Sequence, residues 1–192
     1  MSAFLGGSSR QSLQVARGAL DVAVKGATGA AAASLSADLF VVAKTLHGSL
    51  SLRRAITDPS RDASAKETLV KDLFKSLSAP AIDLTAKVSS IRWSNSGDLV
   101  QVLEQLAIEA QASAANIDGA LDRVEDELFA AEQAVAGSPE LRKALITVGA
   151  DRAKTGIVND LFAKNGSPYT VALLSQLVTT LRGRSIEVAF HD

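Results

Sequence analysis

The stretch LRRAITDPSRDASAKETLVKDLF, residues 52–74, predicts two helices separated by a break. Pro59 cannot continue the first helix, because proline lacks a backbone N–H and restrains the residue before it to extended conformations. On either side of the break, apolar residues recur at spacings of three and four, as one face of a helix requires. These residues are Leu52, Ala55, Ile56, Ala65, Leu69, Leu73 and Phe74. We expect the Leu-Phe pair that ends the stretch to anchor the second helix in a core.

A similar stretch returns at residues 141–162 as LRKALITVGADRAKTGIVNDLF. An offset of 89 aligns residues 38–40 with 127–129 and residues 52–56 with 141–145. After one deletion in the loop, an offset of 88 aligns residues 72–74 with 160–162 and Pro80 with Pro168. Because the only gap falls in a loop, we interpret the pattern as an internal duplication.

The expected fold is all-α, with two related helical bundles at residues 1–115 and 116–192 joined by a long helix. Alanine and leucine supply most of the 47% hydrophobic content, and aromatics are only 4%, which favours close-packed helices. Between residues 98 and 136 there is one glycine, Gly119, and no proline, so this region is either one long helix or two helices. The chain ends in LRGRSIEVAFHD without a helix stop, and we expect the second bundle to be truncated there.

Other helix boundaries follow from capping and stop signals. Ser9 is a candidate N-cap for a helix from residue 9 to about 26, and Ser36 for one from 36 to 48, after an Ala/Gly break at residues 26–33. Pro80 suits the first turn of a helix that runs to Ile91. Trp93, near the end of that helix, is either a core residue or the rim of a groove.

The sequence offers no pattern for catalysis or for a metal or cofactor. It contains no cysteine, its two histidines are far apart, and the acidic run at residues 122–127 would spread around a helix. Residues 1–97 carry 12 Lys or Arg against 7 Asp or Glu, and residues 98–192 carry 8 against 14. Because the basic residues are scattered, nucleic acid is not an expected partner. No stretch has 18 uninterrupted apolar residues and no secretory signal opens the chain, so we expect a soluble protein.

Three segments resemble the N-terminal helical region of the delta subunit of bacterial F-type ATP synthase, a family related to the mitochondrial oligomycin-sensitivity-conferring protein. They are SSRQSLQVARGALDVAV (8–24), LHGSLSLRRAITDPSRDASAKETLVKDLF (46–74) and IRWSNSGDLVQVLEQLA (91–107). The later segments DRVEDELF (122–129) and ELRKAL (140–145) are similar to the longer delta subunits of actinobacteria, in which this region is extended.

The resemblance implies a non-catalytic stator subunit without a cofactor. It would join the catalytic head to the peripheral stalk, so that the head resists the torque of the rotor, and would lie at the cytoplasmic face of the plasma membrane through the complex alone. In the family, the N-terminal bundle binds the N-terminal helices of the α subunits between its first and fifth helices. The b subunits bind mainly a C-terminal α/β domain, which we expect to be missing after RGRSIEVAFHD.

On this resemblance the groove residues are Leu13, Ala16, Leu20, Leu84, Val88 and Ile91. Packing in the core is the rival interpretation of each of them. The alternative function is a helical ligand-binding or regulatory domain outside ATP synthase. Such a domain would need a large apolar cavity with a few convergent polar groups.

Overall fold

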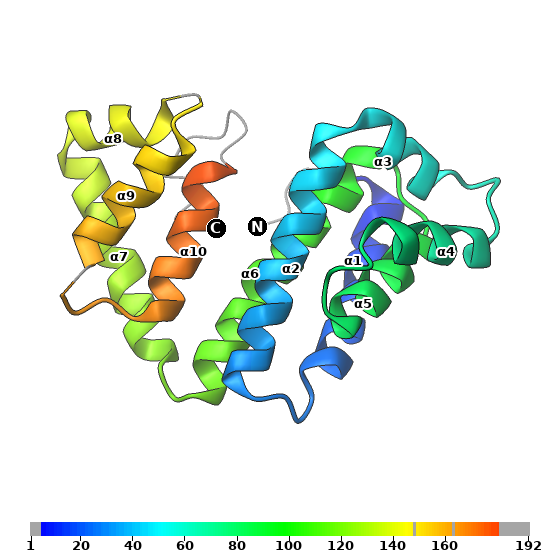
Figure 1. Cartoon of the computed structure of the whole chain (residues 1–192), viewed down its shortest axis with the longest axis horizontal. Coiled ribbons are helices and arrows are strands. Elements are labelled where there is room, and N and C mark those ends of the chain that lie inside the picture. The colour runs from blue at the N-terminus through cyan, green and yellow to red at the C-terminus, as the bar shows by residue number, and fades with distance from the viewer. Residues whose placement is uncertain (1–4, 148, 163, 181–192) are drawn as a thin grey trace. The chain divides into compact units, whose positions relative to one another are not determined.

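The computed structural model describes residues 5–147, 149–162 and 164–180 of the chain, and all regular structure in these ranges is α-helical. This confirms the all-α prediction. The helices are α1 (Gly7–Val24), α2 (Gly29–Gly48), α3 (Leu50–Thr57), α4 (Ala63–Leu73), α5 (Ala79–Ser90), α6 (Ser96–Ile117), α7 (Leu121–Gly137), α8 (Pro139–Ile146), α9 (Asp151–Phe162) and α10 (Pro168–Thr179) (Figure 1). The predicted truncation concerns residues outside the described ranges.

The chain forms two compact units, residues 1–114 and 115–192. Each unit is described by itself below. That the units are separate domains, with a boundary between residues 115 and 116, stays a prediction.

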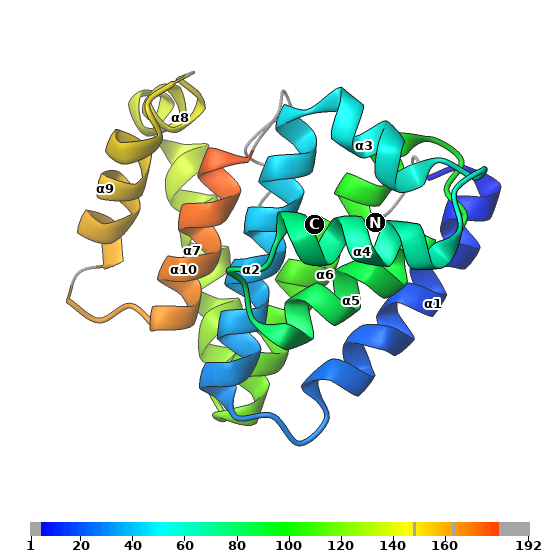
Figure 2. The same ribbon diagram turned by 45° about the vertical axis from the view of Figure 1, so that its right-hand side comes forward.

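Helix α5 is central to the first unit. It packs against α1 on one side and α4 on the other, and it also contacts α2 and α3. Figure 2 shows α4 and α5 side by side. The largest fully buried side chains of the unit are Leu39, Val42, Leu46, Ile56, Val70, Val88, Leu99, Leu103 and Leu106.

Helix α2 begins seven residues earlier than the sequence predicted. Its N-cap is Thr28, whose side chain accepts a hydrogen bond from the Ala31 N–H at 3.2 Å. The Ala/Gly run is part of the helix because alanine is the strongest helix former. Ser36 is therefore an interior residue and not a cap: it is buried, and its hydroxyl donates to the Ala107 carbonyl at 2.7 Å.

Among the described helices, α2 alone is long and apolar enough to cross a membrane by length and composition, with a mean hydropathy of 1.3. Half of that window is buried inside the protein. The buried residues include Leu35, Leu39, Val42 and Leu46, which are spaced as one helix face. Their burial identifies α2 as a core helix of the first unit.

The long segment after residue 96 forms two helices, which decides between the alternatives left by the sequence. Helix α6 ends at Ile117 and α7 begins at Leu121. Between them Gly119 has a φ of 67°, in the left-handed region that glycine adopts without a steric penalty.

The second unit contains α7 to α10, with α10 packed on α9 and α7 (Figure 1). In the described part of this unit, each helix contributes one or two residues to a buried hydrophobic cluster. The buried cluster consists of Ala131, Val135, Leu145, Val158, Leu174 and Val178.

The two units repeat their helix caps. The Ser49 hydroxyl accepts the Leu52 N–H at the start of α3, and the Ser138 hydroxyl accepts the Leu141 N–H at the start of α8. Ser138 follows Ser49 by 89 residues, and Leu141 follows Leu52 by 89 residues, which is the offset found in the sequence. The agreement supports the internal duplication, which stays a prediction.

A carboxylate also holds the same loop in each unit. Asp38 accepts hydrogen bonds from the Ser78 backbone N–H at 3.0 Å and from its hydroxyl at 2.6 Å. Glu127 accepts the Ser167 N–H at 2.9 and 3.0 Å. These four residues again keep the offset of 89.

The offset of 89 between these serines disagrees with the alignment of Pro80 with Pro168 that was made from the sequence. Pro168 is the first residue of α10, whereas Pro80 is the second residue of α5. Their alignment at an offset of 88 is therefore wrong by one position. Both prolines occupy the first turn of a helix, where a missing N–H costs nothing.

The Leu-Phe pairs are anchors only in part. Phe74 is buried and Phe162 is half-buried, but Leu73 and Leu161 are exposed. The expectation was wrong for Leu73, because α4 ends there and the chain then turns Phe74 into the core.

Candidate partner-binding site

The predicted groove residues belong to α1, to α5 and to the residue after α5, and these two helices pack against each other. Five of them are buried and only Ile91, directly after α5, is half-buried. We call these six residues the α1–α5 seam. A partner could reach this seam only at its outer edge. The five buried residues are Leu13, Ala16, Leu20, Leu84 and Val88.

Two polar contacts define the flanks of α1. Ser12 donates its hydroxyl to the Arg92 carbonyl at 2.6 Å, so this flank lies toward the C-terminal end of α5. Arg17 donates to Glu109 of α6 at 2.6 and 2.8 Å, so the opposite flank lies toward α6. The N-terminal half of α1 therefore adjoins the end of α5 that carries Ile91.

Two large apolar side chains are exposed on the Ser12 flank. Val15 and Val22, at i+3 and i+10 from Ser12, lie close to the same helical line at 100° per residue. Val15 is 53% exposed and Val22 is 70% exposed. Between them Gly18 is also exposed, and a Cβ added there would meet no atom within 4 Å. This face of α1 can accept another helix at close range.

We call Val15, Gly18, Val22 and Ile91 the outer α1–α5 surface. Its residues come from α1 and from the residue after α5. The sequence missed Val15 and Val22 because they lie off the core stripe. The sequence signal that could have identified this surface was the pair of valines seven residues apart on the otherwise polar face of α1.

Trp93 is a core residue and not a rim residue. Its side chain is buried, and its indole N–H donates to the Val88 carbonyl at 3.0 Å. This bond fixes the turn after α5 and so fixes Ile91 in the outer α1–α5 surface.

A buried polar network ties the start of α1 to the same turn. Ser9 donates its hydroxyl to the Asp98 carboxylate at 2.6 Å and accepts the Ser94 N–H at 2.8 Å. Asn95 donates to the other oxygen of Asp98 at 2.5 Å. Ser9 was expected to cap α1, but the helix begins at Gly7 and the hydroxyl serves this network.

Comparison with known proteins decides the family. No family model matches the chain. It is 42% identical over 183 residues to the ATP synthase subunit delta of Streptomyces coelicolor, covering 94% of this chain and 66% of that protein. It is 41% identical over 188 residues to the same subunit of Streptomyces avermitilis, covering 97% and 68%. The chain belongs to the ATP synthase delta subunit family. The subunit of Acidothermus cellulolyticus, 39% identical over 191 residues, covers 97% of the chain and 69% of its own length.

The relatives confirm the resemblance seen in the sequence and the prediction of a non-catalytic subunit. They place the chain in a membrane-associated complex. The chain spans about two thirds of the length of these relatives.

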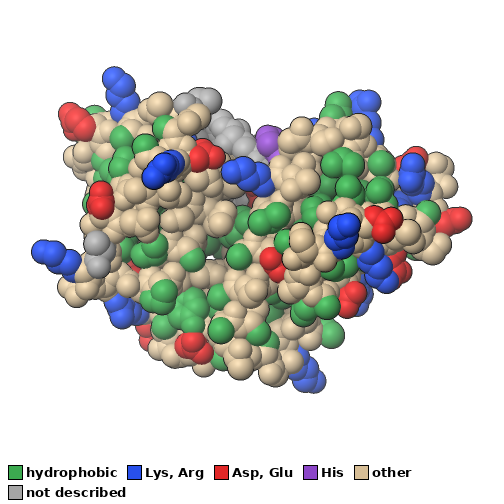
Figure 3. Space-filling model, in the orientation of Figure 1, with side chains coloured by type: hydrophobic (Ala, Val, Ile, Leu, Met, Phe, Trp, Pro, Cys, Tyr) green, Lys and Arg blue, Asp and Glu red, His purple; other side chains and the backbone are tan. Residues whose placement is uncertain are grey.

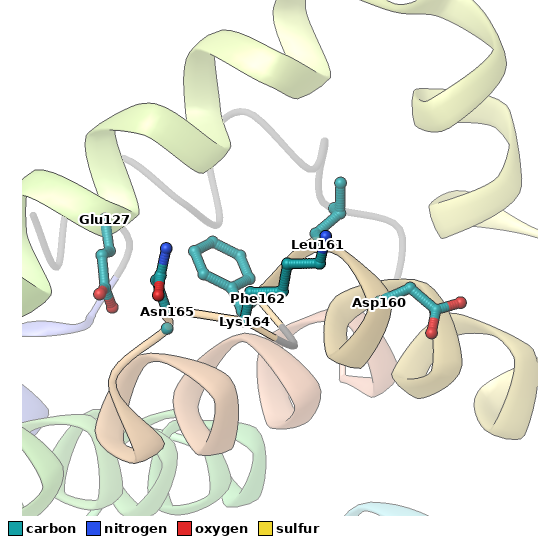
Figure 4. Close-up of a pocket in the computed structure, with 7 residues that line it drawn as sticks. Glu127, Asp160, Leu161, Phe162, Lys164 and Asn165 are labelled. Carbon is teal, nitrogen blue, oxygen red and sulfur yellow. The ribbon is translucent and has the colours of Figure 1, made fainter.

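The described part of this delta subunit holds no group of three or more His, Cys, Asp or Glu side chains that could bind a metal ion. One cavity of about 320 Å³ lies at the end of α9 and borders Glu127 (Figure 4). Glu127 is already bonded to the Ser167 N–H and to Arg123 at 2.8 Å. Because Asp38 has the same structural role in the first unit, the carboxylate at this cavity holds a loop.

Electrostatics agree with this structural role. Burial alone would raise the pKa of Glu127, but the neighbouring Thr170 hydroxyl, the Ser167 N–H and Arg123 favour its charged form and together lower its pKa. The Thr170 oxygen has no direct hydrogen-bond partner in the structure, so Ser167 and Arg123 give the geometric basis of the shift. The rest of the surface carries acidic and basic side chains interspersed, as Figure 3 shows for one face.

Proposed function

We propose that this chain is part of the stator of F-type ATP synthase and that its first unit binds the N-terminal helix of an α subunit on the outer α1–α5 surface. The single observation that supports this site is the exposed pair Val15 and Val22 beside the seam predicted as the groove. An amphipathic partner helix can cover both valines and reach Ile91.

The buried seam residues act indirectly in this proposal. Leu13, Ala16 and Leu20 hold α1 against α5, while Val15 and Val22 make the contact. Covering a valine contributes about 1.5 kcal/mol, so two of them support a weak to moderate affinity by themselves. Several such contacts on one connector raise the total affinity through effective concentration.

The mechanism is mechanical. Rotation of the central shaft applies torque to the catalytic head, and the delta subunit links that head to the peripheral stalk, whose b subunits are its second partner. The complex lies at the cytoplasmic face of the plasma membrane, and the delta subunit is peripheral to the membrane. Compact helical units without a reactive group suit this role.

The test is a titration of the chain with a peptide of about twenty residues from the N-terminus of its α subunit, followed by calorimetry and by chemical shifts. Val15→Asp and Val22→Asp should each weaken binding about tenfold or more, because each places a charge in an apolar contact. Val41→Asp is the matched control, since Val41 is an exposed valine on α2. Absence of binding to the unmodified chain would refute the function, and unchanged affinity in both α1 variants would refute the site.

A further inference from the structure

The polar network at the start of α1 includes a buried charge. Asp98 lies in the first turn of α6 and is almost fully buried. Its two carboxylate oxygens accept the Ser9 hydroxyl at 2.6 Å and the Asn95 side-chain amide at 2.5 Å. A buried carboxylate is costly unless hydrogen bonds compensate it, so this charge is stable in only one arrangement of its donors.

The network continues from Asp98 to the turn between α5 and α6. Ser9 also accepts the Ser94 N–H at 2.8 Å, and Ser12 donates to the Arg92 carbonyl at 2.6 Å. The Ser94 side chain also packs closely against Gly6, since a Cβ on Gly6 would lie 2.4 Å from the Ser94 hydroxyl. The first two turns of α1 therefore have a fixed register against residues 92–98.

This register joins the two halves of the outer α1–α5 surface. Val15 lies one turn beyond Ser12 on α1, and Ile91 directly precedes Arg92. The bond between Ser12 and Arg92 thus connects segments that carry both apolar contacts. A shift of α1 along α5 would separate Val15 from Ile91 without changing either side chain.

We propose that Asp98, acting through Ser9, is a positioning residue for the partner helix: it sets the register of α1 against the turn after α5 and thereby aligns Val15 with Ile91. The inference rests on the proposed function and names residues that do not touch the partner. Asp98 also sits favourably near the N-terminus of α6, where a negative charge is stabilised. If the contact between Ser9 and Asp98 only stabilised the fold, its removal would lower the free energy of unfolding. The folded protein would then bind the partner helix with unchanged affinity.

The test compares two serines that each tie a helix to α6. Ser9→Ala removes the hydroxyl bonded to Asp98, and Ser36→Ala removes the buried hydroxyl bonded to the Ala107 carbonyl at 2.7 Å. Both variants should unfold at lower denaturant concentration than the unmodified chain. Affinity for the α-subunit peptide is measured well below the unfolding temperature, with the folded fraction confirmed by circular dichroism. We expect about five- to twentyfold weaker binding for Ser9→Ala and unchanged binding for Ser36→Ala, a difference of about 1–2 kcal/mol at the partner surface.

Gly6→Ala provides a second probe that removes no hydrogen-bonding group from the chain, although it displaces the Ser94 side chain, whose hydroxyl lies 2.7 Å from that of Ser8. The added Cβ would collide with Ser94, so this variant should also weaken peptide binding and shift the amide resonance of Ile91. If the unmodified chain binds and both Ser9→Ala and Gly6→Ala bind equally well, the positioning role is wrong. If Ser36→Ala weakened peptide binding as much as Ser9→Ala, the positioning role would also be wrong. Any loosening of the helical bundle would then be enough to weaken peptide binding. If the unmodified chain binds no peptide, the proposed function itself fails.

Discussion

The Arg17 guanidinium donates two hydrogen bonds to a single carboxylate oxygen of Glu109, from Nε at 2.8 Å and from Nη2 at 2.6 Å, across 92 residues of chain. This contact ties α1 to α6 on the flank opposite Val15. Both side chains are partly exposed, at 39% and 30%. The pair therefore restrains α1 more than it stabilises the fold.

Replacing Arg17 by Met should lower the free energy of unfolding by only about 0.5–1 kcal/mol, because solvent screens the pair. Urea denaturation of Arg17→Met, Glu109→Gln and the double variant would give the coupling energy of the pair. Peptide affinity should stay unchanged, since neither residue lies on the outer α1–α5 surface. A coupling energy well above 1 kcal/mol would contradict this prediction.

Leu20→Asp and Val22→Asp should behave differently although they lie two residues apart. Leu20 is buried, so an aspartate there places an uncompensated charge in the core and should cost about 4 kcal/mol or more. Val22 is exposed, so its variant should remain folded and lose only partner binding. Circular dichroism during thermal unfolding distinguishes them, and a stably folded Leu20→Asp protein would mean that the seam is open.

The core of the second unit can be tested with two adjacent residues. Leu145 is 1% exposed and Ile146 is 49% exposed. Leu145→Ala should lower the free energy of unfolding by about 2–5 kcal/mol, because it removes buried methyl groups and leaves a cavity. Ile146→Ala should cost much less. Hydrogen exchange of amides in α9 and α10 would report the loss, and similar effects of the two variants would argue against this core.

The lowered pKa of Glu127 predicts a pH dependence of stability in the second unit. Its folded pKa lies below the ordinary value of 4.5, so its ionised form stabilises the folded state. This contribution is fully present above the unfolded pKa and is lost as the pH falls through the folded pKa. Glu127→Gln should therefore be less stable than the unmodified chain at pH 7, and the difference should shrink below about pH 4. A difference that stays constant between pH 7 and pH 3 would exclude this linkage.

Much of the fold could be predicted from the sequence, because apolar spacing and helix stops are local signals. Pro59 lies in the loop between α3 and α4, and Gly119 in the one between α6 and α7, as proline and glycine favour. The start of α2 could not be predicted as well, because Ser36 has the residue type of a cap. Only its neighbour in space, the Ala107 carbonyl, shows that it is an interior residue.

The repeat predicted equivalent positions but not equivalent environments. Phe40 and Phe129 align at the offset of 89, yet Phe40 is 3% exposed and Phe129 is 63% exposed. Phe40 lies one turn after Ser36, on the face of α2 that contacts α6. The equivalent of Ser36 in α7 is the exposed Glu125. Burial depends on which helix covers a face, and the alignment of two segments does not contain that information.

The site residues predicted from the sequence lie on α1, on α5 and directly after α5, and five of the six are buried. Periodicity finds the stripe of a helix that is buried, whichever neighbour buries it. It therefore selected Leu84 and Val88, which are buried. The exposed residues Val15 and Val22 required the directions of the Ser12 and Arg17 contacts, which only the three-dimensional structure provides.

The distance along the chain between α1 and α6 has a consequence for synthesis. Because Arg17 and Glu109 are 92 residues apart, α1 leaves the ribosome well before the helix that completes its packing. At a translation rate of about 5–20 residues per second, that interval is roughly 5–20 s. Throughout it, the apolar stripe of α1 at Leu13, Ala16 and Leu20 has no α6 to close the bundle around it. Apolar surface that is exposed in this way favours aggregation of the growing polypeptide until α6 emerges.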